Sequence, residues 1–101
     1  MMNAIMTEGR IRELEGMGFK RWTKGNYDRL YINADKLGLD CDYYKTGNIS
    51  SATFGGKKIS NSMAREMKAA KTYIDVRTGR VYSDSYTLQR TVENLIDDED
   101  E

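Results

Sequence analysis

Residues 72–83 read TYIDVRTGRVYS, and this segment carries the clearest structural signal in the chain. Polar and apolar residues alternate over 72–76 and again over 80–83, with the short link 77–79 between them. Such alternation is typical of half-buried strands, and the glycine that ends the link suits the left-handed conformation of a three-residue hairpin loop. We therefore predict a β-hairpin with Gly79 in the left-handed conformation.

Two more hairpins are predicted upstream of this one. In residues 19–32 the turn falls at 23–26, and in residues 41–54 it falls at 46–48, where glycine and asparagine favour tight turns. Gly55 and Gly56 then turn the chain into residues 57–59. Because hairpins join antiparallel neighbours, we expect the strands to form an antiparallel sheet.

Three helices are expected, each beginning after a residue whose side-chain oxygen can accept a backbone hydrogen bond. The first starts after Thr7, the second after Ser60 or Ser62, and the third after Asp84 or Ser85. A single helical turn over 34–37 ends at a glycine. The apolar positions expected on the helices are Met63 and Met67 in the second helix and Leu88, Val92, Leu95 and Ile96 in the third.

These elements predict an α+β fold, with a small antiparallel sheet built from hairpins and three short helices. A chain of 101 residues is the size of one domain. We expect residues 1–96 to form a single globular unit and residues 97–101, all acidic, to be a frayed tail. The side chains expected to be buried together are Leu30, Ile32, Ile74, Val76, Val81, Leu88, Val92 and Leu95.

One face of the predicted strands combines tyrosines with basic residues. Successive side chains of a strand point to opposite faces, so each strand sorts its residues into two sets. The aliphatic residues of 27–32, 72–76 and 80–83 fall on one face, and tyrosine and arginine fall on the other. The candidate binding residues on this second face are Tyr27, Arg29, Tyr31, Tyr73, Arg77, Arg80 and Tyr82.

This composition has three interpretations. Tyrosine rings stack on unpaired bases while neighbouring cations meet phosphates, so the face could bind nucleic acid. Tyrosine is also common in ordinary strands beside solvated arginine or lysine, and a helix that covered the face would place the rings in the core. Tyrosine, tryptophan and arginine are, in addition, the residues that anchor protein–protein contacts.

Charge is unevenly distributed along a chain whose net charge is zero. Residues 45–92 hold nine basic and three acidic residues, whereas residues 93–101 hold six acidic and no basic residues. This asymmetry indicates a polyanion or another charged macromolecule as partner. Lys57 and Lys58 follow the glycine pair and could assist by touching phosphates. The segment lacks the spacing of a phosphate-binding loop, however, and a plain tight turn is the commoner role of such a segment.

Catalytic and metal-site chemistry finds little support in the residue types. The absence of histidine excludes Ser-His-Asp and Cys-His catalysis as well as imidazole metal sites. Cys41 is the only cysteine, which excludes an internal disulfide bond. Asp40 and Asp42 lie on one side of a strand, but no third ligand for a cation is identifiable. We therefore expect no enzymatic activity, no cofactor and no small-molecule substrate.

No apolar run approaches the length of about 18 residues that a membrane helix needs, and the first residues lack the pattern of a secretory signal. A cytoplasmic location is expected. The sequence thus favours a small non-catalytic intracellular binding protein that engages nucleic acid or a nucleoprotein through the Tyr/Arg sheet face. The alternative is an inhibitor or accessory factor, of the kind that phages and mobile elements encode, which blocks a nucleic-acid-handling enzyme.

Deletion of residues 97–101 is expected to tighten non-specific binding to nucleic acid. The deletion removes five negative charges that compete with phosphates for the basic segment. Fluorescence anisotropy with labelled single-stranded DNA should show the largest gain at about 0.01 M salt, where the Debye length is about 30 Å. An affinity that is unchanged or lower at every salt concentration would contradict the competition.

Overall fold

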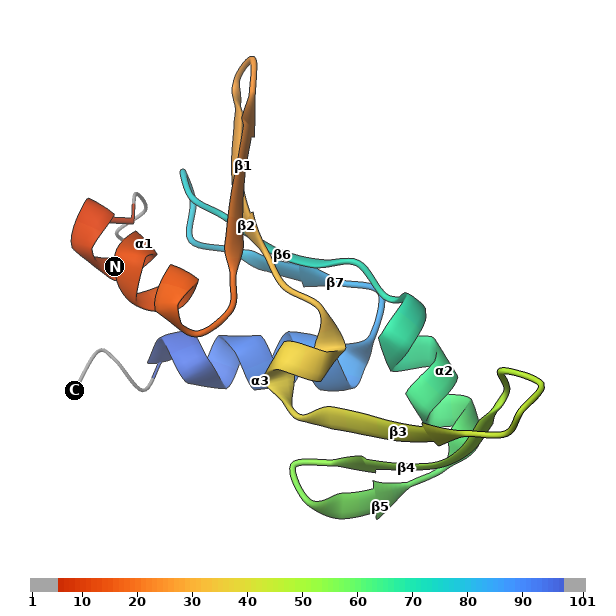
Figure 1. Ribbon diagram of the computed structural model, residues 1–101. Helices are drawn as coiled ribbons and strands as arrows, with labels where there is room; N and C mark the ends of the chain where they lie inside the picture. The colour runs from red at the N-terminus through yellow and green to blue at the C-terminus, as the bar shows by residue number, and fades with distance from the viewer. Residues whose placement is uncertain (1–5, 98–101) are drawn as a thin grey trace.

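Seven strands form two separate antiparallel sheets in the computed structural model, which describes residues 6–97 (Figure 1). The four-stranded sheet has the order β1-β2-β6-β7, made of β1 (Lys20–Lys24), β2 (Tyr27–Tyr31), β6 (Thr72–Asp75) and β7 (Val81–Ser83). The three-stranded sheet is made in chain order of β3 (Leu39–Tyr43), β4 (Ile49–Phe54) and β5 (Lys57–Ile59). The predicted α+β class is confirmed, but the strands fall into two sheets where one was expected.

The hairpin that the sequence signalled most clearly is present. Thr72 lies opposite Ser83 and Ile74 opposite Val81, and Gly79 has the predicted positive φ of 74°. The loop is one residue longer than expected, because the backbone N–H of Asp75 donates to the carbonyl oxygen of Arg80 (2.9 Å) and closes the strand pair there. The four residues 76–79 therefore form the loop.

The β1–β2 hairpin projects from the body of the molecule (Figure 1). Lys24 pairs with Tyr27, so the loop consists only of Gly25 and Asn26. Gly25 has a φ of 59°, and a positive φ at the first loop position is typical of the type II′ turn that fits the twist of a hairpin. Every residue of β1 is exposed, and the strand is held by its pairing with β2 and by the ion pair of Arg21 with Glu8 of the first helix.

The helices begin where the sequence predicted. They are α1 (Glu8–Gly16), α2 (Asn61–Ala69) and α3 (Tyr86–Asp97), and a 3-10 turn, η1 (Ala34–Leu37), ends at Gly38 with a φ of 117°. The predicted tail lies, from residue 98 onward, outside the described residues. The capping hydrogen bonds run from the backbone N–H of Arg10 to Thr7 Oγ1 (3.1 Å), of Met63 to Ser60 Oγ (3.0 Å) and of Leu88 to Ser85 Oγ (3.3 Å).

Two clusters of buried side chains take the place of the single expected core. α3 contributes to both, because Leu88 and Val92 lie one turn apart on its buried face and each enters a different cluster. The cluster under the four-stranded sheet contains Ile11, Leu14, Phe19, Leu30, Ile32, Ile74, Val76 and Val92. The cluster under the three-stranded sheet contains Ala34, Leu39, Ile49, Ala52, Ala64, Met67 and Leu88.

Three of the predicted core positions differ from expectation. Leu88 is buried, but in the second cluster, whereas Val81 and Leu95 are only partly buried. Val81 lies on β7, an edge strand that has a neighbour on one side alone. Leu95 lines an open apolar cavity of about 270 Å³ beside Phe19 and is therefore not closed off by packing.

The second helix also buries a different pair of residues from the one expected. Ala64 and Met67, three residues apart, face the core, and Met63 is exposed. Positions i and i+3 lie on one face of a helix, and so do positions i and i+4, so the sequence pattern did not decide which pair is buried.

Among the helices within residues 6–97, none combines the length and the apolar composition needed to cross a bilayer.

Truncation of the buried face of α3 is expected to destabilise the whole fold. Leu88→Ala should lower the free energy of unfolding by about 2–5 kcal/mol and Val92→Ala by about 1–3 kcal/mol, because each removes fully buried methyl groups. The exposed Asn94 on the same helix is the control, and Asn94→Ala should change stability by less than about 0.5 kcal/mol. Chemical denaturation measures all three, and a loss below about 0.5 kcal/mol for either buried residue would contradict the docking of α3.

Candidate nucleic-acid interface

The register of the four-stranded sheet aligns the aromatic residues that the sequence placed on one strand face. Tyr31 lies directly opposite Tyr73, and Tyr73 lies opposite Tyr82. Residues that face each other across antiparallel strands point to the same side of the sheet. We call this side the aromatic face; it comprises Lys20, Trp22 and Lys24 of β1, Tyr27, Arg29 and Tyr31 of β2, Tyr73 and Asp75 of β6, and Arg80 and Tyr82 at β7.

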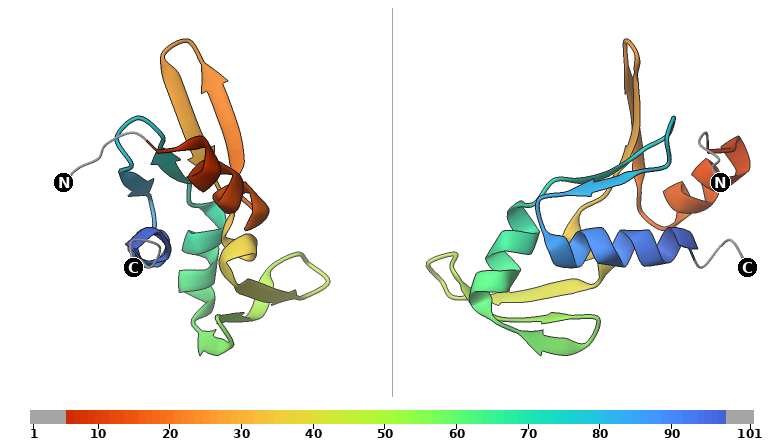
Figure 2. Two further views of the ribbon diagram at one scale, coloured as in Figure 1. Left: turned by 90° about the vertical axis from the view of Figure 1, so that its left-hand side faces the viewer. Right: turned by 180° about the vertical axis from the view of Figure 1, so that it is seen from behind.

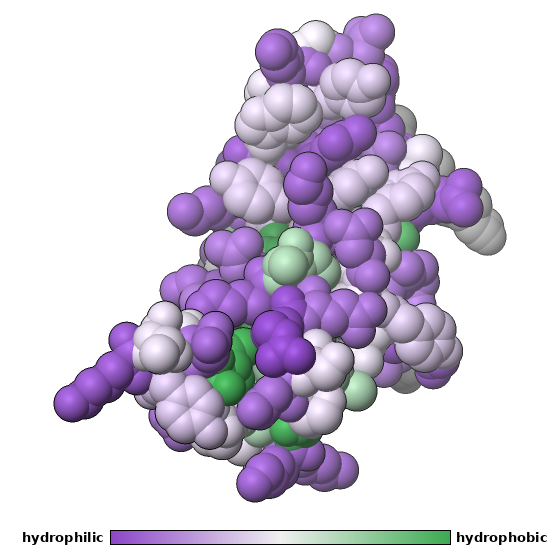
Figure 3. Space-filling model, turned by 90° about the vertical axis from the view of Figure 1, so that its right-hand side faces the viewer, coloured by the Kyte–Doolittle hydropathy of each residue, from purple (hydrophilic) through white to green (hydrophobic). Residues whose placement is uncertain are grey.

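The aromatic face is open. The exposed fractions are 58% for Tyr27, 41% for Tyr31, 40% for Trp22 and 38% for Tyr82, whereas Leu30 on the opposite side is fully buried. On the side of the molecule seen in Figure 3, pale and purple side chains alternate over the projecting hairpin, without the green of aliphatic residues. The interpretation in which a helix covers the tyrosines is therefore wrong.

Arg29 lies at the centre of this face. Its guanidinium carbon is 4.4 Å from the ring centroid of Tyr73, 4.7 Å from that of Tyr27 and 5.9 Å from that of Trp22. Each distance is within the range of a cation–π interaction, which contributes about 0.5–1 kcal/mol at an exposed site. A single cation thus connects rings from three strands.

The contacts continue to the far edge of the sheet. The rings of Tyr73 and Tyr82 are stacked, with centroids 5.1 Å apart and planes 23° apart, and the guanidinium of Arg80 lies 5.9 Å from the Tyr82 centroid. The result is a continuous row of rings and guanidinium groups that crosses all four strands. We call it the cation–π stack; its members are Trp22, Tyr27, Arg29, Tyr73, Tyr82 and Arg80.

A cavity of about 380 Å³ adjoins the cation–π stack. Trp22, Tyr31 and Tyr73 supply aromatic walls, and Arg29 and Lys71 supply positive charge. Tyr31 makes no ring or cation–π contact among residues 6–97, so its ring is not committed to the stack. The cavity combines flat apolar surfaces with cations, which is the chemistry that stacks a planar ring and pairs with an anionic group.

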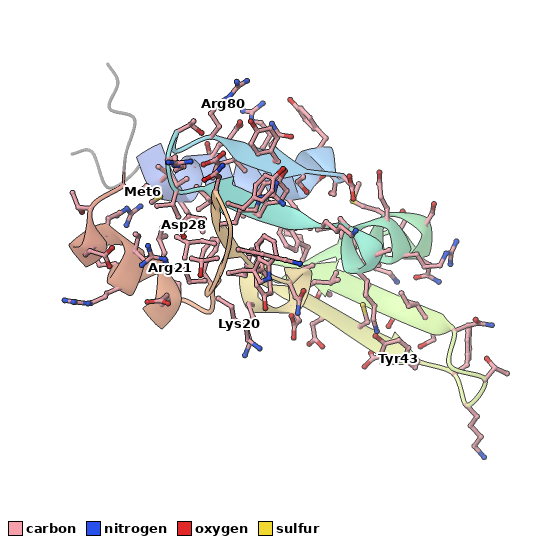
Figure 4. The ribbon with its side chains drawn as sticks, turned by 90° about the horizontal axis from the view of Figure 1, so that it is seen from above. Met6, Lys20, Arg21, Asp28, Tyr43 and Arg80 are labelled. Carbon is pink, nitrogen blue, oxygen red and sulfur yellow. The ribbon has the colours of Figure 1, made fainter. Side chains whose placement is uncertain are left out.

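The opposite side of the hairpin is braced by an ion-pair network. Arg21 Nε and Nη2 donate to the two carboxylate oxygens of Asp28 (2.9 and 2.7 Å), and Arg21 Nη1 lies 3.2 Å from Glu8 Oε1 of α1. Figure 4 shows Arg21 and Asp28 on the side of the hairpin that faces α1. The hydrogen bonds from Arg21, together with its charge, hold the pKa of the Asp28 carboxyl below its usual range.

The structure brings six of the nine predicted binding residues together on the aromatic face. Arg77 is not among them, because the longer loop turns it toward the hairpin tip, where its Nη1 donates to the carbonyl oxygen of Asn26 (3.0 Å). Lys57 and Lys58 are also separate, since β5 belongs to the other sheet and lies at the opposite end of the molecule from the projecting hairpin (Figures 1 and 2). The six are Tyr27, Arg29, Tyr31, Tyr73, Arg80 and Tyr82.

Four residues of the site were missed at the level of sequence. Lys20, Trp22 and Lys24 alternate along β1, but their neighbours are polar, so no aliphatic set distinguished the two faces of that strand. Lys71 lies between α2 and β6 and belongs to neither element, so its place in the sequence did not put it on a strand face. Only the pairing of β1 with β2, and of β6 with β2, places these residues beside the tyrosines.

A second, more polar cavity of about 450 Å³ lies next to the first. Asp35, Asp40 and Cys41 line it, together with Tyr43 and Lys68. The Lys68 ammonium group donates a hydrogen bond to the Tyr43 hydroxyl and lies 4.4 Å from the centroid of that ring, and this hydrogen bond raises the pKa of Lys68. Within residues 6–97, no three histidine, cysteine or carboxylate side chains are grouped so that they could hold a metal ion.

Comparison of the chain with protein-family models, with curated proteins and with solved structures found no match.

Asp28→Asn is expected to lower the free energy of unfolding by about 0.5–1 kcal/mol at pH 7, because it removes one partner of a bidentate ion pair at the surface. The folded-state pKa of Asp28 lies below its unfolded value of about 3.9, so its contribution is present above that value and is lost as the pH falls through the folded pKa.

Denaturation of both proteins across a pH series from 7 to 2 measures this effect, and the two stabilities should converge at the acid end. Asp40→Asn is the matched control, since the exposed Asp40 carboxylate makes no hydrogen bond or ion pair within residues 6–97. An equal loss for both variants, or a difference that persists in acid, would contradict the role of the ion pair.

Proposed function

We propose that this protein is a non-catalytic module that binds single-stranded nucleic acid through its aromatic face. The observation that carries the proposal is the open cation–π stack with the aromatic cavity beside it. Exposed rings in fixed positions, interleaved with cations, are the surface on which unpaired bases stack while the phosphate chain is neutralised. A cytoplasmic location, as expected from the sequence, belongs to the same proposal.

The charge of the aromatic face agrees with a polyanionic ligand. Its side chains include Lys20, Lys24, Arg29 and Arg80 against a single carboxylate, Asp75. That carboxylate accepts a hydrogen bond from the backbone N–H of Arg77 (2.9 Å) and is thereby directed to its own loop. The local excess of positive charge therefore supports binding of phosphates, although the whole chain is neutral.

The ordered geometry of the stack supports tight binding of bases. Arg29, Tyr73 and Tyr82 hold one another in place across three strands. Side chains that are already ordered lose less conformational entropy when a ligand binds, which raises affinity. Single strands are favoured over duplexes as ligands, because the faces of bases within a duplex are already stacked on one another.

Exposed tryptophan, tyrosine and arginine also support a second candidate, the protein inhibitor or accessory factor. The sign of the charge on the aromatic face distinguishes these two candidate functions. A factor that occupies the nucleic-acid groove of an enzyme meets a basic surface, and the aromatic face is itself basic. Through this face the protein would instead meet an acidic partner, which makes nucleic acid the better-supported ligand.

The intrinsic fluorescence of the protein reports directly on the proposed site. Trp22 is the only tryptophan in the chain, and it belongs to the cation–π stack and lines the aromatic cavity. Titration with single-stranded oligothymidine at about 50 mM salt is expected to quench this fluorescence. If neither quenching nor anisotropy detects binding under these conditions, the proposed function is wrong.

Tyr31→Ala is expected to weaken binding by about fivefold to 150-fold, because one stacked base is worth about 1–3 kcal/mol. The control is Tyr44→Ala, which removes an equally large exposed ring from the loop between β3 and β4. Fluorescence anisotropy with labelled oligothymidine compares the two variants. Equal losses for both would show that the ligand does not select the aromatic face.

The double variant Arg29→Ala, Arg80→Ala is expected to flatten the dependence of affinity on salt. Each lost phosphate contact on a single strand lowers the slope of log K against log salt by about 0.7. The double variant Lys57→Ala, Lys58→Ala removes the same charge from β5 and should leave the slope unchanged. A slope that responds to the β5 lysines and not to the arginines would move the site to the other sheet.

A further inference from the structure

We propose that Arg77 is a positioning residue for the aromatic face: it holds the tip of the β1–β2 hairpin in place and thereby orders the rings of Trp22 and Tyr27 for the ligand. The inference rests on the proposed function and extends it from the residues that contact the ligand to one that does not. The sequence places Arg77 among the ligand contacts, but it lies in the loop between β6 and β7, and its side chain is directed to the hairpin tip.

The tip of the β1–β2 hairpin extends beyond the four-stranded sheet. β6 pairs with β2 from Arg29 to Tyr31, and the backbone N–H of Val76 donates to the carbonyl oxygen of Asp28 (3.0 Å) one residue further out. Among residues 6–97, the strand residues beyond that point pair only with the other strand of the hairpin. A two-stranded hairpin on its own is marginally stable in water, so the tip needs a contact from outside to stay ordered.

Arg77 supplies such a contact at the outermost point of the hairpin. Its Nη1 donates to the carbonyl oxygen of Asn26 (3.0 Å), which is one of the two residues of the hairpin loop. The hydrogen bonds of Arg21 and, in addition, the charges of Arg21 and Arg77 lower the pKa of Asp28, whose carboxylate lies on the side of the hairpin opposite the aromatic face. Arg77 therefore reaches the hairpin from the side opposite the rings.

The loop that carries Arg77 is itself closed by hydrogen bonds. The backbone N–H of Arg77 donates to Asp75 Oδ1 (2.9 Å), and that of Gly79 donates to the Asp75 carbonyl oxygen (2.7 Å). The loop rises from the sheet in the same direction as the hairpin (Figures 1 and 2). Because the loop is ordered, the hydrogen bond from Arg77 fixes the tip relative to the sheet.

The tip carries one end of the cation–π stack. Tyr27 lies opposite Lys24, next to the hairpin loop, and its ring centroid is 6.4 Å from that of Trp22 and 4.7 Å from the guanidinium carbon of Arg29. A tip that moves takes Tyr27 with it and loosens these contacts. The rings must then be ordered when the ligand binds, which costs conformational entropy and lowers affinity. Loss of the Arg77 side chain therefore weakens binding without removing a phosphate contact.

Two measurements on Arg77→Ala test the proposal. In the free protein, ¹⁵N relaxation should show the backbone order parameters of residues 23–27 falling from about 0.85, the value of ordered backbone, toward the flexible range below about 0.6, with no change in β6. In anisotropy titrations with labelled oligothymidine, the affinity should fall about threefold or more, while the slope of log K against log salt stays unchanged. Loss of a residue that contacts phosphate would instead lower that slope by about 0.7.

Arg80→Ala is the matched control, since it removes the same charge from the aromatic face itself. It should give the opposite pattern, a lower slope with unchanged order at the hairpin tip. Thermal denaturation checks that both variants are folded.

Unchanged order parameters or an unchanged affinity in Arg77→Ala, or a slope that falls as it does in Arg80→Ala, overturns the positioning role and leaves the proposed function standing. A wild-type protein that does not bind oligothymidine overturns the proposed function and, with it, the role of Arg77 in binding, whatever the order parameters show.

Discussion

The packing of α3 against both hydrophobic clusters is the interaction on which the rest of the structure depends. Leu88 and Val92 are one helical turn apart, and each completes the core of a different sheet. α3 and α1 bury their apolar residues on the aliphatic side of the four-stranded sheet, against Leu30 and Ile74. The remaining helix, α2, packs in the cluster under the three-stranded sheet. Within residues 6–97, no helix therefore covers the other side of the four-stranded sheet, and the aromatic face is left open.

An open sheet face must be stabilised by contacts within itself. The cation–π stack supplies them, since Arg29 connects rings from β1, β2 and β6, and Tyr73 passes the contact to Tyr82 on β7. The same contacts that hold the strands together also fix the rings for a ligand. Tyr31 makes no such contact among residues 6–97, which separates a ring available for binding from the residues that build the platform.

Much of this arrangement follows from local sequence, and the remainder depends on contacts between distant segments. Alternation over 72–83, the helix caps and the sorting of tyrosine and arginine to one face are local features, and the sequence predicted each of them. The pairing of Leu30 with Ile74 joins segments more than 40 residues apart, and no local pattern specifies it. For that reason the division into two sheets, the place of Trp22 and the assignment of Leu88 to the second cluster were not predicted. Arg77 was misplaced because the strand ends at Asp75, so that Arg77 lies in the loop and not on a strand face.

The most direct test of the central claim is the mapping of the ligand surface by nuclear magnetic resonance, with ¹⁵N-labelled protein and oligothymidine. The account predicts shifts of the Trp22 indole N–H and of backbone amides in β1, β2 and β6, with little change in β3, β4 and β5. Shifts concentrated in the three-stranded sheet, or no shifts at ligand concentrations up to about 1 mM, the weak end of measurable affinity, would contradict it.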